Sequence, residues 1–410
     1  MTKILHTSDW HIGRTLYGRK RYDEFEAFLN WLAETIDEYN IDALLVAGDI
    51  FDSAAPSNRA QELYYRFLCR IGASSCRHVV VAAGNHDSPS FLDAPKELLK
   101  ALDVHVVGSI SDSPENEVLV LRSTRDLPEL IVCAVPYLRD RDIRAGEANE
   151  SVEDKQQKLI DGVCNHYAAV ADFAQKKRKE LGGDIPIIAM GHLFTAGGQT
   201  IDGDGVRELY IGSLAHVTAG IFSPSFDYVA LGHLHVPQKV NGSDAIRYSG
   251  SPLPMGFGEA GQKKSVCLVE FKNTETSVCL IEVPRFRHLE RIQGDWETIS
   301  NKIIELSATG TKGWVEVVYE GDAIIGDLRE RLEAATADTQ MEILRVKNNR
   351  IVDRVLGQME EAETLEDLNA NEVFERCLAI NNVPEDQRSE LLDAYRETLT
   401  RFWEEDTQAE

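Results

Sequence analysis

Residues 2–13 read TKILHTSDWHIG, a short apolar segment followed at once by polar side chains. Ile4 and Leu5 are typical of a buried strand, and Asp9 and His11 follow them with one residue in between. In an extended segment, residues two apart point to the same side, so this carboxylate and this imidazole can meet just past the strand. The pair indicates a metal ion, although a single Asp-x-His also occurs as a turn aspartate beside a surface histidine. Further ligands are needed to choose between these interpretations.

Five further apolar runs follow along the chain, and each ends in small or polar residues. They are ALLVAGD (43–49), HVVVAAGNHD (78–87), LIVCAVP (130–136), PIIAMGH (186–192) and DYVALGHLH (227–235). Apolar residues at spacings of three and four predict helices around 25–36 and 63–68, between the first three runs. Alternating strands and helices predict a layered α/β fold with buried strands, in which ligands collect where the strands end.

The ends of these runs supply one recurring set of donor side chains. They give Asp9 and His11, then Asp49 and Asp52, then Asn85, His86 and Asp87, and finally His192, His233 and His235. Carboxylate, amide and imidazole donors suit borderline divalent cations such as Mn²⁺ or Fe²⁺. Two such cations about 3.5–4 Å apart can bind a phosphate ester and activate a water. The sequence therefore predicts a two-metal centre.

In this order the motifs DWH, GDIFD, GNHD, GHL and GHLH resemble those of the calcineurin-like metallophosphoesterases. The longer phrases HTSDWHIG, VAGDIFD, ALGHLH and GSPLPMGF, and EVFERCL in the tail, are similar to those of bacterial nuclease subunits of this family. One departure concerns the protein phosphatases of the superfamily, which carry an arginine just after the second motif. Ser53 and Ala54 stand there in this chain, which disfavours a phosphatase.

The resemblance implies a role for each donor side chain. One metal would be held by Asp9, His11, Asp49 and His235, and the other by Asp49, Asn85, His192 and His233, with Asp49 bridging. His86 would contact the phosphate and help the leaving group without binding metal, and Asp52 would orient His86 or a ligand. Asp87 is interpreted as a turn-forming residue within GNHD.

The resemblance also implies an activity and partners. It points to a 3′→5′ exonuclease and endonuclease for double-stranded DNA, using two divalent cations, with Mn²⁺ expected and Fe²⁺ or Mg²⁺ as alternatives. The partner would be a long coiled-coil ATPase, with the chain as a homodimer within a heterotetramer that processes DNA ends and hairpins. Two alternatives stay open: a phosphodiesterase for cyclic nucleotides or other small phosphoesters, and a non-catalytic DNA clamp protein with a degenerate metal site.

The alternation of strand-like and helix-like stretches changes towards the C-terminus. We therefore predict three domains. Residues 1–284 would form the nuclease domain, a layered β-sandwich flanked by helices, which ends after two β-rich runs between 265 and 283. Residues 285–350 would form a small α+β capping domain, with helices at 296–306 and 324–332 and strands at 314–320 and 341–346. Residues 351–410 would form a helical tail that binds the partner. Its two apolar stripes are Val373, Phe374, Cys377 and Leu378, and Leu391, Leu392, Tyr395, Leu399, Phe402 and Trp403.

The net charge and the cysteine content limit the possible binding partners and cellular location of the protein. With 43 Lys+Arg and 68 Asp+Glu, the net charge of −25 repels DNA and anionic membranes, so phosphate must be engaged locally. The basic clusters 19–21 and 139–144 are the candidates for such contacts. The seven cysteines include no C-x-x-C pair, which favours a reducing cytoplasm, and no segment has the length and apolarity of a membrane span. His6, His78 and His105 lie in or beside apolar runs and are interpreted as structural or surface residues.

Overall fold

The structure, a computed structural model, describes residues 1–111, 113–143, 151–195, 218–272, 275–321 and 325–348, together with Phe374, Leu378, Arg388, Leu391, Leu392 and Tyr395. It forms two compact units, Met1–His288 and Leu289–Glu410. The division into three domains at 284 and 350 stays a prediction. Across the described part of the chain, no helix combines the length and apolarity needed to cross a membrane.

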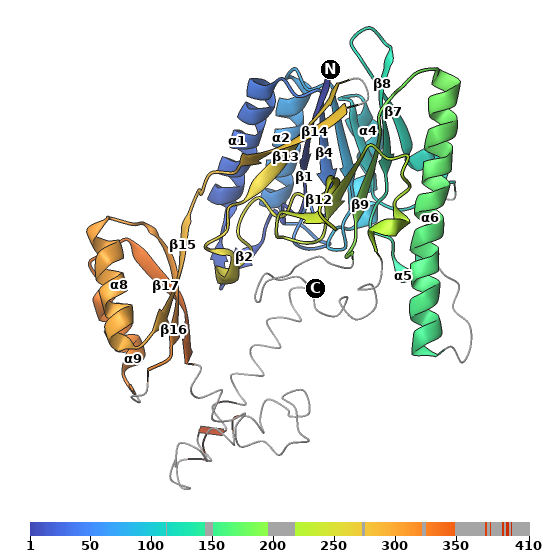
Figure 1. Cartoon of the computed structure of the whole chain (residues 1–410). Coiled ribbons are helices and arrows are strands. Elements are labelled where there is room, and N and C mark those ends of the chain that lie inside the picture. The colour runs from blue at the N-terminus through green and yellow to red at the C-terminus, as the bar shows by residue number, and fades with distance from the viewer. Residues whose placement is uncertain are drawn as a thin grey trace. The chain divides into compact units, whose positions relative to one another are not determined.

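The first unit contains two six-stranded sheets (Figure 1). The first has the order β14-β13-β1-β4-β5-β6, and the second has the order β11-β12-β10-β9-β8-β7. The first consists of β1 (Thr2–Thr7), β4 (Ala43–Ala47), β5 (His78–Ala82), β6 (Val104–Val107), β13 (Ser265–Lys272) and β14 (Glu275–Glu282). The second consists of β7 (Val118–Arg122), β8 (Pro128–Ala134), β9 (Ile187–His192), β10 (Tyr228–Gly232), β11 (Gln238–Val240) and β12 (Ser243–Tyr248).

The central strands of both sheets are parallel. In the first sheet β1, β4, β5 and β6 run in one direction, and β13 pairs antiparallel with β1. In the second sheet β8, β9, β10 and β12 are parallel. Parallel strands end at the same edge of a sheet, which is where open α/β sheets collect ligands.

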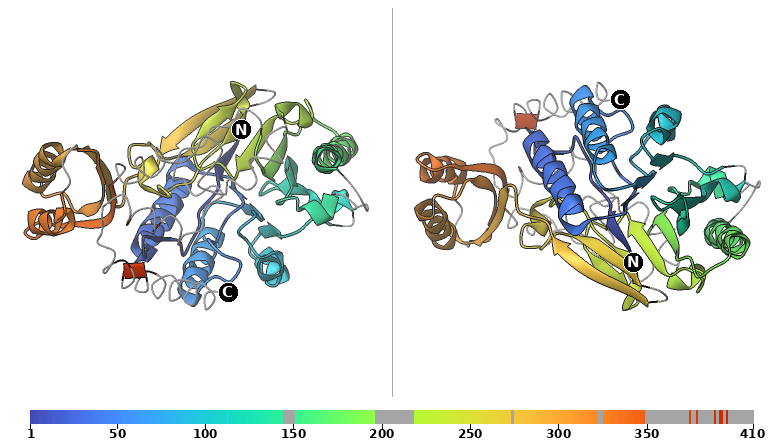
Figure 2. Two further views of the ribbon diagram at one scale, coloured as in Figure 1. Left: turned by 90° about the horizontal axis from the view of Figure 1, so that it is seen from below. Right: turned by 90° about the horizontal axis from the view of Figure 1, so that it is seen from above.

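The sheets and helices are stacked in four layers, which Figure 2 shows from two sides. Helices α1 (Tyr22–Tyr39) and α2 (Asn58–Gly72) pack on the first sheet, and α6 (Val152–Leu181) packs on the second. A third apolar cluster, with Ile4, Val80 and Ile188 among its members, fills the space between the sheets. The α/β layered fold predicted from the sequence is therefore confirmed. The smaller elements are β2 (Thr15–Leu16), β3 (Arg19–Lys20), α3 (Pro89–Asp93), α4 (Lys96–Lys100) and α5 (Asp140–Ile143).

Helix α1 shows why the sequence forms these layers. Phe25, Phe28, Leu32 and Ile36 recur at spacings of three and four, and all four are fully buried. Each fully buried side chain of this kind contributes about 1.5–3 kcal/mol of hydrophobic free energy. Helix α2 begins with Ser57 as N-cap, whose side chain accepts a hydrogen bond from the backbone of the first turn.

The second unit contains a three-stranded sheet in the order β15-β16-β17. Its elements are β15 (His288–Gly294), α8 (Trp296–Ala308), β16 (Gly313–Tyr319), α9 (Leu328–Thr336) and β17 (Met341–Asn348). The sequence did not predict β15. The helix predicted at 324–332 begins later, at Leu328, because Gly326 and Asp327 form the turn before it.

Part of the predicted tail stripes can be described. Phe374, Leu378, Leu391, Leu392 and Tyr395 are helical, and the rings of Phe374 and Tyr395 stack with centroids 4.0 Å apart. Leu378 is buried, whereas Leu391 is 40% exposed. The remaining predicted stripe residues, Val373, Cys377, Leu399, Phe402 and Trp403, lie outside the described residues.

His6 connects the two sheets of the first unit. Its ring has no exposed surface and lies 3.0 Å from the Tyr228 hydroxyl and 3.2 Å from the Leu231 carbonyl. Burial lowers the pKa of His6 to about 3. The unfolded chain binds this proton near pH 6.5, so the free energy of unfolding falls as the pH drops from 6.5 towards 3.

We expect His6→Gln to make stability less sensitive to acid. Between pH 7.5 and 5 the parent should lose about 2 kcal/mol of unfolding free energy through this residue, and the variant should not. The variant should be less stable at pH 7.5, where the parent has both hydrogen bonds. Urea unfolding of metal-free protein at pH 7.5 and 5.0 checks this, and equal pH dependence in the two chains would contradict it.

Candidate metal centre

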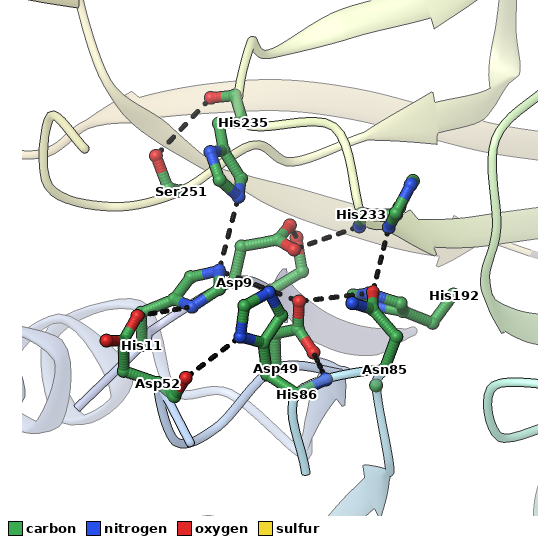
Figure 3. Close-up of polar contacts among 12 residues, drawn as sticks. Asp9, His11, Asp49, Asp52, Asn85, His86, His192, His233, His235 and Ser251 are labelled. Atoms are coloured by element: carbon green, nitrogen blue, oxygen red, sulfur yellow. Dashed lines mark hydrogen bonds and ion pairs between the residues drawn. The ribbon is translucent and has the colours of Figure 1, made fainter. Parts of the chain in front are cut away.

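The nine side chains predicted to carry the chemistry face one another at one edge of the two sheets (Figure 3). They follow β1, β4 and β5 of the first sheet and end or follow β9 and β10 of the second. They are Asp9, His11, Asp49, Asp52, Asn85, His86, His192, His233 and His235. Segments more than two hundred residues apart thus meet at one place, which the order of motifs alone could not show.

The backbone at this edge is turned sharply. Asp9, His11, Asp49 and His233 have φ angles of 53°, 47°, 51° and 100°, in a region that non-glycine residues rarely adopt. The extended segment expected for Asp9 and His11 is therefore wrong, because β1 already ends at Thr7. The two side chains converge because left-handed turns aim them. Backbone strain of this kind is concentrated at functional sites.

Glycines allow these turns to come close together. A Cβ atom at Gly84 would collide with the carboxylate and main chain of Asp49, and one at Gly48 would collide with the His192 ring. Gly48 also has a φ of 86°. Only glycine satisfies both requirements, which explains the Gly-Asp and Gly-Asn pairs in the motifs.

The donor atoms form two groups that share Asp49. In one, the Nε2 atoms of His11 and His235 are 3.2 Å apart, beside Asp9. In the other, His192 Nε2 lies 3.0 Å from Asn85 Oδ1. The Oδ2 atom of Asp49 lies 3.6 Å from His11 Nε2 and 3.2 Å from His192 Nε2. Its position between the two groups is the one a bridging ligand would occupy.

Hydrogen bonds on the far side of the rings decide which nitrogens can bind metal. His192 Nδ1 lies 3.0 Å from the Ala47 carbonyl, which can only accept, so Nδ1 carries the proton. Its Nε2 atom then faces the oxygens of Asn85 and Asp49. Lone pairs and carboxylate oxygens in such contact repel one another unless a proton or a cation lies between them. The donor set therefore fits divalent cations, and the His192 ring has the orientation typical of a metal-bound histidine.

Burial and neighbouring charges shift the pKa values of the buried carboxylates and of His192. Burial raises the pKa of Asp9 to about 7. Burial would also raise the pKa of Asp49, but the nearby His192, His11 and His86 hold it well below its usual range. Burial opposes charge on His192, yet Asp49 raises its pKa to about 9. Asp49 therefore stays ionised near neutral pH.

His86 is held from two sides. Its backbone N–H donates to Asp49 Oδ1 at 2.8 Å, and its ring Nδ1 donates to the Asp52 carbonyl at 2.8 Å. These contacts fix a proton on Nδ1 and the orientation of the ring. Asp52 orients His86 through its main chain, whereas its carboxylate lies 3.2 Å from His11 Nδ1.

Asp87 has a larger role than a local turn. Its carboxylate accepts hydrogen bonds from the backbone N–H groups of Gly84 at 2.9 Å, Ile50 at 3.2 Å and Phe51 at 3.0 Å. It thereby ties the loop after β5 to the loop after β4. Its side chain is 2% exposed, and burial, with Asp49 nearby, raises its pKa to about 6.

A buried ion pair behind His235 was not found from the sequence. Lys264 Nζ lies 2.6 Å from Glu259 and donates to the His235 carbonyl at 2.9 Å and to the Ser251 hydroxyl at 3.1 Å. The other Glu259 oxygen is 3.9 Å from His235 Nδ1. The pair holds the backbone of His235 and places a carboxylate near its ring. The phrase GSPLPMGF, which precedes Glu259, was the only available signal.

The predicted basic clusters differ in accessibility. Arg21 is 1% exposed, pairs with Glu24 at 2.9 Å and donates to the Pro254 carbonyl at 2.7 Å, so its assignment as a phosphate contact is wrong. Arg19 and Lys20 remain exposed in β3. In the second cluster, Arg139 lies 3.4 Å from the Asp87 carbonyl, beside the centre, and residue 144 lies outside the described residues.

Comparison with known proteins accords with this geometry. Residues 2–237 match the calcineurin-like phosphoesterase family, and residues 285–382 match the Type 5 capsule protein repressor C-terminal domain. The chain is 36% identical over 403 residues to the SbcD chain of the SbcCD nuclease of Escherichia coli (strain K12), covering 97% of this chain and 98% of the relative.

Two other bacterial SbcD proteins match the chain in part. The one from Rhodobacter capsulatus is 38% identical over 277 residues, covering 65% of this chain and 66% of the relative. The one from Bacillus subtilis is 35% identical over 276 residues, covering 67% of each. The resemblance found in the sequence motifs is confirmed, and the chain belongs to the calcineurin-like phosphoesterase family, among the SbcD components of SbcCD nucleases.

Proposed function

We propose that this protein is a metal-dependent DNA nuclease that works with an SbcC-type coiled-coil ATPase on DNA ends and hairpins. The activities would be 3′→5′ exonuclease on double-stranded DNA and endonuclease. The observation that carries the proposal is the set of nine side chains gathered at the strand ends. Family membership supports phosphoester chemistry, and the names of the relatives support a nuclease.

The ligand assignment follows the two donor groups. Asp9, His11, Asp49 and His235 would hold one cation, and Asp49, Asn85, His192 and His233 the other. We expect Mn²⁺, because nitrogen and oxygen donors without thiolate suit it, with Fe²⁺ or Mg²⁺ as alternatives. Two such cations supply Lewis-acid stabilisation of the phosphate and a water of lowered pKa.

The residues of this chain would prepare that chemistry. Asp49 contributes the negative charge shared by the two groups, and its Oδ1 positions the His86 backbone. With Nδ1–H held by the Asp52 carbonyl, a second ring proton on His86 Nε2 would contact the phosphate and pass to the leaving sugar oxygen. Asp87 and the Glu259–Lys264 pair keep the surrounding loops fixed, which maintains the alignment that catalysis requires.

Comparing substrates tests the proposal. We would incubate the full chain with Mn²⁺ and end-labelled linear duplex, with and without the ATPase, beside a small chromogenic phosphodiester. Cleavage of duplex that the ATPase stimulates supports the nuclease. Turnover of only the small ester supports a phosphodiesterase for cyclic nucleotides or other small phosphoesters, and no turnover of either supports a non-catalytic clamp.

The tail is the proposed contact with the ATPase. Leu391 is exposed although it belongs to an apolar stripe, and the chain carries acidic residues around it. An amphipathic helix of this kind can lie in a partner's groove. The complex would be cytoplasmic, with two copies of the chain in a heterotetramer.

We expect deletion of residues after Arg350 to abolish co-purification with the ATPase while the chain still cleaves small phosphodiesters. Affinity pull-down measures the first effect and chromogenic turnover the second. The point variant Leu391→Glu should weaken the complex without changing the fold, and Arg388→Glu, three residues away, is the matched control. Complex formation after the deletion would refute the assignment, and unfolding of the truncated chain would favour packing of the tail on its own domain.

A further inference from the structure

A second cluster of metal-binding side chains lies at the opposite end of β5 from the proposed centre. His78 is the first residue of β5, and Asp103 and His105 lie at the start of the neighbouring strand β6. One donor atom from each of the three lies within 4.8 Å of the other two. Two donors at about 2.0–2.1 Å from one ion are at most roughly 4.2 Å apart, so small side-chain rotations would close the site.

The hydrogen bonding of the His78 ring leaves one of its two nitrogens without a partner. Its Nε2 lies 2.8 Å from the Arg122 carbonyl, which can only accept, so Nε2 carries the proton. The other nitrogen, Nδ1, is buried and has no hydrogen-bond partner. An unsatisfied buried polar atom costs about 1–3 kcal/mol, which a bound cation would relieve. Histidines that bind metal commonly donate their other N–H to a carbonyl in this way.

The positions of the other two donors, Asp103 and His105, are also suited to metal binding. Asp103 has a φ of 55°, and its backbone carbonyl accepts from Val79 at 3.0 Å, which fixes it between the two strands. His105 is half-buried at the start of β6. The His78 and His105 rings lie with centroids 6.1 Å apart. Both are placed to contribute a nitrogen lone pair.

A cavity of about 540 Å³ adjoins the cluster and is lined by Cys76, Arg122 and Asp126 as well as the three donors. It leaves room for water to complete the coordination. Cys76 is not one of the donors that lie within 4.8 Å of one another, and its Sγ lies 3.4 Å from the His78 carbonyl. The donor set is therefore two imidazoles and one carboxylate, which suits Zn²⁺.

We propose that His78, Asp103 and His105 bind one divalent transition-metal ion, such as Zn²⁺, at a site separate from the centre at the strand ends. The site would join the starts of β5 and β6. A strand rises about 3.3 Å per residue, so the length of β5 alone separates the two sites by about 13 Å. This assignment replaces the structural or surface role inferred for both histidines from the sequence.

Metal stoichiometry tests the proposal. The full chain is stripped with chelator, equilibrated with Zn²⁺ and analysed by plasma mass spectrometry. Asp103→Asn/His105→Gln should bind one equivalent fewer than the parent, and Asp126→Asn, which changes a cavity wall and no donor, should match the parent. The same difference should persist when both chains also carry Asp49→Asn. Nuclease activity with Mn²⁺ should be unchanged.

The single variant Asp103→Asn is expected to keep the fold, because asparagine tolerates the left-handed backbone and the side chain is exposed. It serves as a second test in case the double variant misfolds. It should weaken Zn²⁺ binding at this site by at least about tenfold. The visible absorption spectrum of the Co²⁺-loaded parent should contain a component that is missing from the spectrum of the Co²⁺-loaded variant. Equal Zn²⁺ content and equal Co²⁺ spectra in parent and variants would overturn the proposal.

Discussion

Asp49→Asn is expected to abolish nuclease activity and to lower the metal content of both proposed sites together. Asparagine keeps the shape of the side chain and tolerates the left-handed φ of 51°. It also keeps an oxygen that can accept from the His86 backbone, so the losses are the charge and the oxygen Oδ2, in whose place an amide NH2 group cannot bind metal. We expect a fall in turnover of at least about 10³-fold, since removing one preorganised electrostatic contact already costs 10²–10³-fold.

Calorimetric titration with Mn²⁺ and activity on labelled duplex measure the two effects. Asp126→Asn is the matched control, because Asp126 also has a left-handed φ, of 61°, and lies in an exposed turn. It should bind metal and cleave DNA like the parent. Two cations bound to Asp49→Asn at unchanged affinity would show that Asp49 does not bridge them.

His86→Gln is expected to keep both cations and to lose activity by roughly 10²–10⁴-fold, the contribution of a positioned general acid. The ring is held through Nδ1 by the Asp52 carbonyl, so we assign Nε2 to the substrate. The geometry also permits another outcome, because His11, Asp52 and His86 each place a donor atom within 4.8 Å of the others. Metal content therefore has to be measured beside turnover.

A substrate with a better leaving group separates the roles of His86. If the residue protonates the leaving oxygen, a nitrophenyl diester should lose much less activity in His86→Gln than DNA does. Loss of metal together with activity would make His86 a ligand. Near-normal turnover of DNA would remove it from the mechanism.

The sequence determined the types of donor and their order along the chain, because each motif needs only local features. Gly48 before Asp49, and Gly84 before Asn85, mark tight turns at the ends of apolar runs. Neighbouring residues in the sequence are enough to recognise such turns. The layered α/β fold followed from the alternation of strands and helices. The capping helix at 324–332 was misplaced because the turn at Gly326 and Asp327 competes with the apolar spacing.

Only the tertiary structure decided how distant segments meet. Asp9 and His11 converge through left-handed turns rather than strand alternation, and hydrogen bonds to Gly48 and Asp49 at 2.9 Å hold those turns. Arg21 belongs to a basic run in the sequence, yet Glu24 and the Pro254 carbonyl keep it in the interior.

The same holds for contacts made across long sequence separations. Asp87 ties two loops, Lys264 supports His235, and His78 meets His105 across neighbouring strands. No local pattern encodes these contacts, because the free energy of burying a charge or a lone pair depends on which partner the fold brings to it.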